Sequence, residues 1–302
     1  MRLGLAAVLT GVLVVGCSPG ESAAARSAAL DQRAREVAMR AAAADSAARS
    51  GRPSDAPIAR WILPYHYSEI SALTLTPEGH LLALGDENSE IWEIDYQRGV
   101  VTRRFTVGDP AIQADFEALV AAAGHLYLLD SKGRIYRTTE GADGSQVGYD
   151  EFDSGLGKEC EFEGISYDPD AGMLLLACKH VHKGAPDDAL VIYRVPPAGG
   201  RAESAPIVIP ITQLQAAGAR WKRFEASEIT RDPHTGHFLV ISSLQHGLVE
   251  ITPAGALVRV ADLPGGHRQP EGAAINPEGR LILADEAAGD RPVITVYPSA
   301  GR

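Results

Sequence analysis

A short phrase returns five times along this chain of 302 residues, and its spacing limits the fold more than any other feature. Each copy has a Ser or Glu, then a small residue or a Glu, then an apolar residue. The copies are Ser71-Ala72-Leu73, Glu117-Ala118-Leu119, Glu163-Gly164-Ile165, Ser227-Glu228-Ile229 and Glu271-Gly272-Ala273. They are separated by 46, 46, 64 and 44 residues. A period of this size indicates an array of supersecondary units.

Each unit has the pattern of four short strands. In the third unit, residues 163–168 end in an Asp-Pro-Asp-Ala-Gly turn, and the apolar run 173–178 follows. Pro presets φ in such a turn and Gly supplies the positive-φ corner, while the apolar run is too short for a helix. An alternating third segment and a more variable fourth, such as residues 90–94 and 100–105 of the first unit, complete the pattern. Four strands in about 45 residues are typical of a β-propeller blade.

We therefore predict an all-β propeller over residues 60–302, with five blades favoured. The 64-residue interval leaves a sixth, degenerate blade open. We interpret residues 195–221 as an insertion instead, with residues 207–210 as an outer strand. Residues 60–64 are predicted to add a closing strand to the last blade, because a ring must join its two ends.

The N-terminus resembles a bacterial lipoprotein signal. Arg2 precedes an apolar run that ends in Leu13-Val14-Val15-Gly16-Cys17, which has the form of a lipobox. The run is too short to span a membrane. We predict a signal peptide over residues 1–17, a lipid on Cys17 that anchors the protein to a membrane, and a location in the cell envelope. The protein would face the periplasm or lie at the outer membrane, which Ser18 weakly favours; a chance Cys after an ordinary signal peptide is the alternative.

Residues 18–59 are rich in Ala, Ser, Arg and Asp and have almost no bulky apolar side chains. Such a segment cannot bury enough surface to fold by itself. We expect a disordered or partly helical tether between the lipid and the propeller.

The net charge of −11 argues against nucleic acid and against an anionic membrane surface as partners. It favours a cation or a neutral ligand. Cys160 and Cys178 flank the hairpin of the third unit, so a disulfide between them is predicted, with two unpaired thiols as the alternative.

The recurring acidic residues point to a site at one mouth of the central channel, since the first strand of each blade lines that channel. Several carboxylates on one axis repel one another unless they are protonated or bridged by a cation. Calcium, which takes six to eight oxygen ligands in flexible geometry, suits such a ring better than magnesium. The absence of Cys-x-x-Cys and His-x-x-x-His pairs argues against zinc. The predicted metal ligands are Glu117, Glu163, Glu271 and Glu228.

Other polar residues near the same mouth are predicted to bind the ligand, namely Ser71, Asp86, Glu87, Ser227 and Asp285. The first residue of each copy is called its anchor below: Ser71, Glu117, Glu163, Ser227 and Glu271. The alternatives stay open: the anchors would line the channel with hydrogen bonds and ordered water, and the acidic segments after the second strands, residues 85–90 and 284–286, would be solvated turns rather than further ligands. Basic residues nearby, including Lys179, are interpreted as ordinary surface charge. No nucleophile elbow and no glycine-rich phosphate loop is present.

Several segments resemble the SdiA-regulated (YjiK-like) family of bacterial propellers. These are Ser68-Glu-Ile-Ser-Ala-Leu, Gly85-Asp-Glu-Asn-Ser-Glu-Ile-Trp-Glu-Ile-Asp95, Phe116-Glu-Ala-Leu, Phe162-Glu-Gly-Ile and Pro270-Glu-Gly-Ala. The resemblance covers about residues 60–298 and implies a propeller, an envelope location and a link to calcium. The family is also similar to esterase-like phytase propellers. This chain departs from the pattern at Ala72 and Ala118, which replace a commoner Gly, and at Ser227-Glu228, where the acidic position is inverted.

Three functions follow as hypotheses. The first is a lipid-anchored, non-enzymatic propeller that binds calcium or a small ligand at the channel mouth, with a binding or scaffolding role and an envelope protein as a further partner. The second is a calcium-dependent hydrolase of phosphoesters or lactones. The third is a structural platform without a metal.

Overall fold

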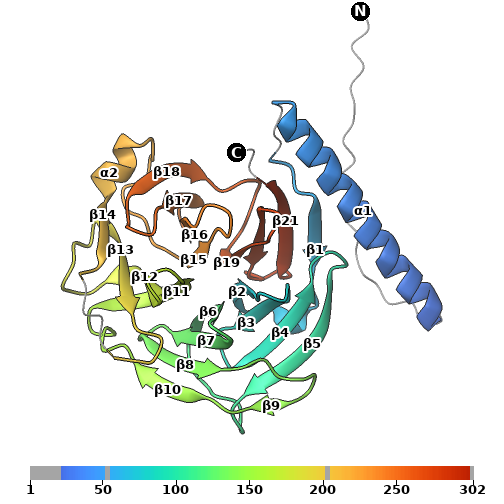
Figure 1. The fold of residues 1–302 in the computed structure, drawn as a ribbon, viewed down its shortest axis with the longest axis horizontal. Helices are drawn as coiled ribbons and strands as arrows, with labels where there is room; N and C mark the ends of the chain where they lie inside the picture. The colour runs from blue at the N-terminus through green and yellow to red at the C-terminus, as the bar shows by residue number, and fades with distance from the viewer. Residues whose placement is uncertain (1–21, 52–54, 201–204, 300–302) are drawn as a thin grey trace, which may run out of the picture.

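Five four-stranded units form a closed ring in the computed structural model, which describes residues 22–51, 55–200 and 205–299 (Figure 1). The innermost strands contact one another in the cyclic order β2, β6, β11, β15, β19 and back to β2. The prediction of a five-bladed β-propeller is confirmed, and the six-bladed alternative is wrong. The predicted signal peptide and Cys17 lie outside the described residues.

Each blade is an antiparallel sheet that runs from the channel outwards. Blade 1 consists of β2 (Ile70–Leu75), β3 (Leu81–Gly85), β4 (Glu90–Asp95) and β5 (Val100–Val107). Blade 2 consists of β6 (Phe116–Ala122), β7 (His125–Asp130), β8 (Arg134–Thr138) and β10 (Asp150–Asp153). Blade 3 consists of β11 (Cys160–Asp168), β12 (Met173–Val181), β13 (Ala189–Val195) and β14 (Ile207–Pro210). Blade 4 consists of β15 (Glu228–Arg231), β16 (Phe238–Ser242), β17 (Gly247–Ile251) and β18 (Leu257–Asp262). Blade 5 consists of β19 (Pro270–Ile275), β20 (Arg280–Asp285), β21 (Val293–Ser299) and β1 (Ala59–Ile62).

The ring closes as the sequence predicts. Strand β1 pairs with β21 in the last blade, with Arg60 opposite Thr295. The long interval holds the outer strand β14 and the short helix α2 (Ile211–Ala216), so it is an insertion. A small addition at the rim was not predicted: β9 (Gln146–Val147), which leaves blade 2 and pairs in parallel with β5 of blade 1.

The second strand of each blade is buried on both faces. In β3 and β16 every residue is buried, because each blade packs between two neighbours. These strands therefore read as continuous apolar runs rather than as alternating ones. Cys160 and Cys178 are bonded as a disulfide in blade 3, with their Cα atoms 5.8 Å apart.

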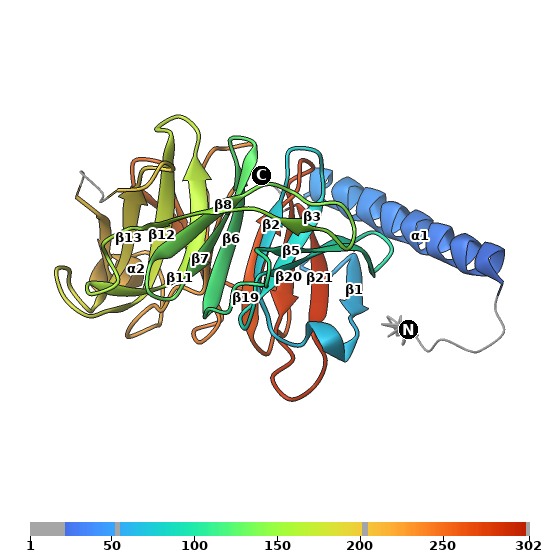
Figure 2. The same cartoon turned by 90° about the horizontal axis from the view of Figure 1, so that it is seen from below.

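A long helix packs against the outside of the ring at blades 1 and 5 (Figures 1 and 2). This helix, α1 (Ala23–Arg49), begins at the N-cap Ser22, and its Val37 and Ala41 are buried. Ion pairs hold it at both ends of the contact: Arg98 reaches Asp31 at 3.0 Å, and Arg280 reaches Asp45 at 3.4 Å. The segment expected to be a tether is thus helical over 27 residues and docked on the propeller. Within the described residues, no helix is both long and apolar enough to cross a bilayer.

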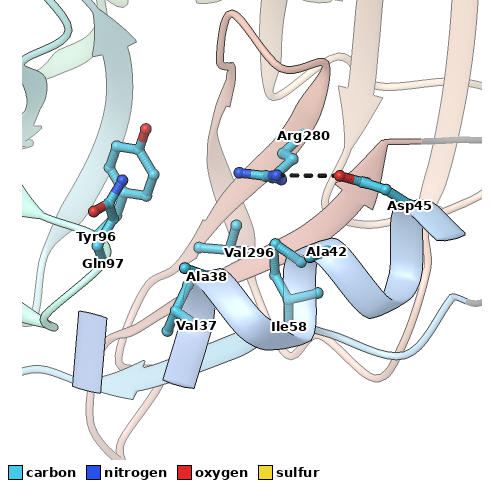
Figure 3. Close-up of a pocket in the computed structure, with 10 residues that line it drawn as sticks. Val37, Ala38, Ala42, Asp45, Ile58, Tyr96, Gln97, Arg280 and Val296 are labelled. Atoms are coloured by element: carbon cyan, nitrogen blue, oxygen red, sulfur yellow. Dashed lines mark hydrogen bonds and ion pairs between the residues drawn. The ribbon is translucent and has the colours of Figure 1, made fainter. Parts of the chain in front are cut away.

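A cavity of about 160 Å³ lies between α1 and the propeller (Figure 3). Its apolar walls include Val37, Ile58 and Val296, and Tyr96 and Arg280 form its polar end. The packing of α1 is therefore incomplete, and a few apolar contacts with two ion pairs hold it in place.

We expect Val37→Asp to release α1 without unfolding the propeller. The substitution puts a buried, unpaired carboxylate in place of the Val37 side chain, whose burial contributes about 2 kcal/mol to the docking of α1. A free Ala-rich helix is marginal in water, so its helical circular dichroism should fall and trypsin should cleave within residues 23–49. Met39→Asp is the matched control, because the Met39 side chain is 65% exposed on the other face. Equal protection from trypsin in both variants would contradict the docking.

Candidate functional site

The anchor residues of four blades lie at β-bulges. In blades 1, 2, 3 and 5 the pairing of the innermost strand with the second strand skips one residue, and the skipped residue is in each case the anchor: Ser71, Glu117, Glu163 and Glu271. A bulge leaves its extra residue outside the ladder and turns its side chain. The same local distortion therefore presents the anchor of four blades at the same edge of the ring.

Three of the predicted metal ligands come together around a lysine. The Lys179 ammonium, near the end of β12, donates a hydrogen bond to the Glu163 carboxylate. Its positive charge also interacts with Glu271 and Glu117. Glutamates from blades 2, 3 and 5 thus share one ammonium. Lys179 was interpreted as surface charge from the sequence, and that interpretation was wrong, because β12 extends far enough to bring the side chain back to the channel.

Burial keeps part of this group protonated near neutral pH. Burial, followed by the charge of Glu163, raises the pKa of Glu117 to about 9. Burial raises the pKa of Glu163 and of Glu271 to about 7, although Lys179 opposes both shifts. Carboxyl groups that cannot all ionise together are expected where several approach one another with limited solvent.

More acidic side chains continue the group at the same mouth. Burial and then the charge of Glu69 raise the pKa of Asp86. Burial and then a hydrogen bond with Glu69 raise the pKa of Glu286 to about 7, and Glu286 also accepts a hydrogen bond from Gln269. Asp115, whose charge acts on Glu117 and Asp86, accepts a hydrogen bond from Ser131 Oγ at 2.7 Å.

Sequence reasoning missed Glu69 and Asp115 as members of this group, whereas Glu286 belongs to an acidic segment after a second strand that the sequence left open as a source of ligands. A signal was available for the two missed residues, because each lies one residue before an innermost strand, at the edge where the anchors lie. Asp86 belongs to the group as predicted. Glu87 is exposed beside Asp86 and raises its pKa.

Glu228 occupies a different position. It corresponds to Ala72, Ala118, Gly164 and Gly272 in the other four blades, where the innermost strands approach closely. A Cβ atom on Gly164 would lie 2.8 Å from the Ile229 nitrogen, and one on Gly272 would lie 2.8 Å from Leu73 Cγ. In blade 4 the Glu is the second residue of the copy instead of the first. Glu228 is therefore the one long side chain among these five positions, and it lies inside the ring.

The Glu228 carboxyl lies at the propeller axis. The backbone amide of Ile229 donates to Oε1 at 2.8 Å, and the amides of Leu73 and Ile165 also interact with the carboxyl. These amides belong to blades 4, 1 and 3, and a group can reach all three only near the centre. Glu228 is 1% exposed, and burial raises its pKa well above the usual value. Because backbone N–H groups from three blades act on it, the carboxyl stabilises the centre of the ring rather than joining the carboxylates at the mouth.

The predicted serines join neighbouring blades. Ser71 Oγ donates to the Phe116 carbonyl at 3.0 Å, from blade 1 to blade 2. Ser227 Oγ donates to the Pro270 carbonyl at 3.1 Å, from blade 4 to blade 5, and accepts from the Ser243 amide. These contacts have the form of the hydrogen-bonded channel lining that the sequence left open.

Asp285 is used inside blade 5. Its carboxylate accepts from His267 Nδ1 at 2.6 Å and from the Arg268 amide at 2.9 Å. The other ring nitrogen of His267 is 2.7 Å from Tyr297 Oη. This buried network fixes the loop before β19, and the role of Asp285 in ligand binding stays a prediction.

As they stand, the carboxylates do not fit a calcium ion. Across the described parts of the chain, no group of three or more His, Cys, Asp or Glu residues has the arrangement of a metal site. Glu163 binds Lys179, and Glu271 accepts hydrogen bonds from Ser243 and Gln269. Calcium would need oxygens from several of these groups at once, so Lys179 would have to leave.

A family model identifies the chain. The SdiA-regulated model matches residues 67–288, which is most of the propeller. The chain belongs to the SdiA-regulated family. No curated protein matches this family member.

Solved structures similar to this SdiA-regulated protein are distant in sequence. Glutaminyl cyclase from Myxococcus xanthus is 14% identical, with 80% of this chain and 95% of that chain covered and a TM-score of 0.54. An aldose sugar dehydrogenase from Streptomyces coelicolor is also 14% identical, with coverages of 79% and 98% and a TM-score of 0.48. A streptogramin B lyase is 13% identical, with coverages of 80% and 86% and a TM-score of 0.46. The likeness to the first of these supports the propeller fold alone.

Proposed function

We propose that this member of the SdiA-regulated family is an envelope-anchored binding protein whose channel mouth holds a cationic ligand. One observation carries the proposal: a connected group of carboxyls lies at the mouth, and three of them, Glu117, Glu163 and Glu271, interact with the ammonium of Lys179. The carboxyls are Glu69, Asp86, Asp115, Glu117, Glu163, Glu271 and Glu286. Such a concentration of acidic groups attracts cations and repels anions.

The lipid on Cys17 would hold the propeller at a membrane surface, with α1 as the connection. Helix α1 begins at Ala23, six residues after Cys17, and it is docked on blades 1 and 5. The propeller would therefore stay near the membrane in a restricted orientation. This is the geometry that a binding or scaffolding role in the envelope needs.

Calcium is the candidate ion that the sequence predicts, and a titration of residues 18–302 tests it. If calcium binds, melting temperature should rise with concentration, since a site filled at 100 times its Kd adds about 2.7 kcal/mol. Glu163→Gln should abolish the rise. Glu78→Gln, in an exposed turn, should leave it unchanged. No rise in the fully stripped wild-type protein would remove calcium as the ligand.

A calcium-dependent hydrolase of phosphoesters or lactones is the second candidate. It gains support from the pairing of Glu117, with a pKa of about 9, and Glu163, with a pKa of about 7, as a proton donor and a proton acceptor. A panel of phosphoesters and lactones, assayed with calcium and with a chelator, tests it. Turnover that Glu117→Gln and Glu163→Gln both abolish would support this candidate, and turnover that survives both variants would contradict it.

A further inference from the structure

The cavity between α1 and the propeller has the size of a small-molecule site (Figure 3). Its volume is about 160 Å³. A cavity of about 150 Å³ with apolar walls is large enough to take a benzene-sized molecule. Val37 and Ala41 of α1 form one wall, and Ile58 and Val296 of the propeller form the other. The cavity lies beside the start of β20, at the end of blade 5 away from the channel mouth.

The polar end of this cavity holds a donor without an acceptor. Arg280 lines the cavity, and its Nε is buried with no hydrogen-bond partner among the described residues. The other two guanidinium nitrogens are used: Nη2 lies 3.4 Å from Asp45 Oδ2, and Nη1 lies 3.8 Å from Glu278 Oε2. A buried N–H without an acceptor costs free energy. An oxygen atom held in the cavity beside Arg280 would remove that cost.

Tyr96 and Asp45 line the same cavity and indicate which kind of oxygen fits. Tyr96 Oη accepts a hydrogen bond from Asn276 Nδ2 at 3.4 Å, so the hydroxyl can donate its own hydrogen elsewhere. Asp45 is an acceptor whose charge is already balanced by Arg280. An anion would compete with Asp45 for Arg280, and a cation would compete with Arg280 for Asp45. An uncharged hydroxyl both accepts and donates, so it matches these groups and leaves the ion pair intact.

We propose that this cavity binds a small uncharged molecule that has an apolar ring or branched chain of about six carbons and one hydroxyl group. The apolar part packs against Val37, Ile58 and Val296, and the hydroxyl accepts a hydrogen bond from Arg280 Nε. Because α1 and the propeller each supply a wall, the molecule binds only while α1 is docked and therefore favours the docked form. This site is separate from the channel mouth, and the proposal does not depend on the cationic ligand.

Trypsin cleavage of α1 in residues 18–302 tests the proposal, with phenol as the probe. Toluene is the matched compound, since it has a methyl group in place of the hydroxyl. If phenol binds only the docked form, cleavage should slow by the factor 1 + [phenol]/Kd, about tenfold at ten times the Kd. Cleavage of a free peptide of residues 23–49 should not change, which excludes an effect of phenol on trypsin. No protection of wild type by phenol would overturn the proposal.

Arg280→Lys tests the role of the hydroxyl. Lys keeps a positive charge for Asp45 but has no N–H at the position of Nε. Phenol should therefore lose affinity relative to toluene, and the ratio of the toluene Kd to the phenol Kd should fall by about fivefold. A ratio equal to that of wild type would overturn the assignment of a hydroxyl to this end of the cavity.

Ala41→Leu tests the cavity itself. Ala41 is 2% exposed on the cavity wall, and the three added carbons should fill the space that phenol needs. Phenol should then slow cleavage by less than about twofold at the concentration that gives about tenfold in wild type. Ala43→Leu makes the same substitution at an exposed position outside the cavity and should behave as wild type.

Ala41→Val, which adds one carbon fewer, keeps the test valid if Ala41→Leu loosens α1 by overpacking. It should also weaken the protection by phenol. Equal protection in wild type and in the Ala41 variant that leaves α1 docked would overturn the proposal, because phenol would then act from another site.

Discussion

Glu228→Ala is expected to lower the free energy of unfolding by about 2–5 kcal/mol, since it removes a fully buried side chain and the acceptor of inward-facing amides. The amides of Ile229, Leu73 and Ile165 belong to three blades, so the loss weakens the centre of the ring rather than one sheet. No other long side chain stands at this layer, where the remaining blades have Ala or Gly. Denaturant unfolding at about pH 6 measures the effect.

Glu228→Gln separates the shape of the carboxyl from its charge. Burial holds Glu228 in its neutral form, and Gln keeps that size and one carbonyl acceptor, so the loss should be less than half that of Glu228→Ala. Glu78→Ala, in an exposed turn, should have little effect. If Glu228→Gln lowered the free energy of unfolding as much as Glu228→Ala, the amides would require a charged carboxylate. The assignment of a neutral carboxyl that stabilises the ring would then be wrong.

Stability is expected to be highest near pH 5 and to fall steadily towards pH 9. Glu163, Glu271 and Glu286 have pKa values of about 7 in the folded protein and Glu117 has one of about 9, against 4.5 for an ordinary Glu. A carboxyl with a raised pKa binds its proton more tightly when folded. Its contribution is complete below pH 4.5 and is lost as the pH rises through the folded pKa, by up to about 1.4 kcal/mol per pH unit for each group.

Glu117→Gln divides this profile into two parts. The variant should keep most of the fall between about pH 5 and 7, to which the three groups with pKa near 7 contribute, and should show a shallower fall between about pH 7 and 9, where Glu228, whose pKa is also raised, still contributes. Glu140 and Glu250 have lowered pKa values and so act below pH 4.5, outside this window. Melting temperatures at constant ionic strength from pH 4 to 9 give both curves. A flat wild-type profile above pH 5 would contradict the burial of the group.

Blade number, blade order and ring closure could be predicted because they follow from local patterns. Turn chemistry such as Asp168-Pro-x-x-Gly172 and apolar runs of four or five residues specify a hairpin wherever they occur. The 46-residue spacing then leaves few ways to arrange five such units. Residues 60–64 could be assigned to the last blade because a ring needs a closing strand, and β1 (Ala59–Ile62) provides it.

The candidate site could be predicted only in part. The anchors Glu117, Glu163 and Glu271 were found by their repetition, but nothing local distinguishes them from Glu228, which shares the repeat and lies on the axis instead. Lys179 was missed because its partners lie 16 to 92 residues away, on three different blades. The Ala-rich segment likewise has no apolar stripe that predicts docking, and α1 is held by contacts with Arg98 and Arg280, far along the chain.

The sequence by itself determined the repeat, the strands within each unit and the residue types that reach the channel, since turns and alternation act over a few residues. Only the tertiary structure decided which of those residues meet. Bulges turn Glu117, Glu163 and Glu271 towards one mouth, and closure of the ring brings Leu73, Ile165 and Ile229 within reach of Glu228. Both depend on distances between blades, and these are set when the apolar faces of neighbouring blades pack together and close the ring.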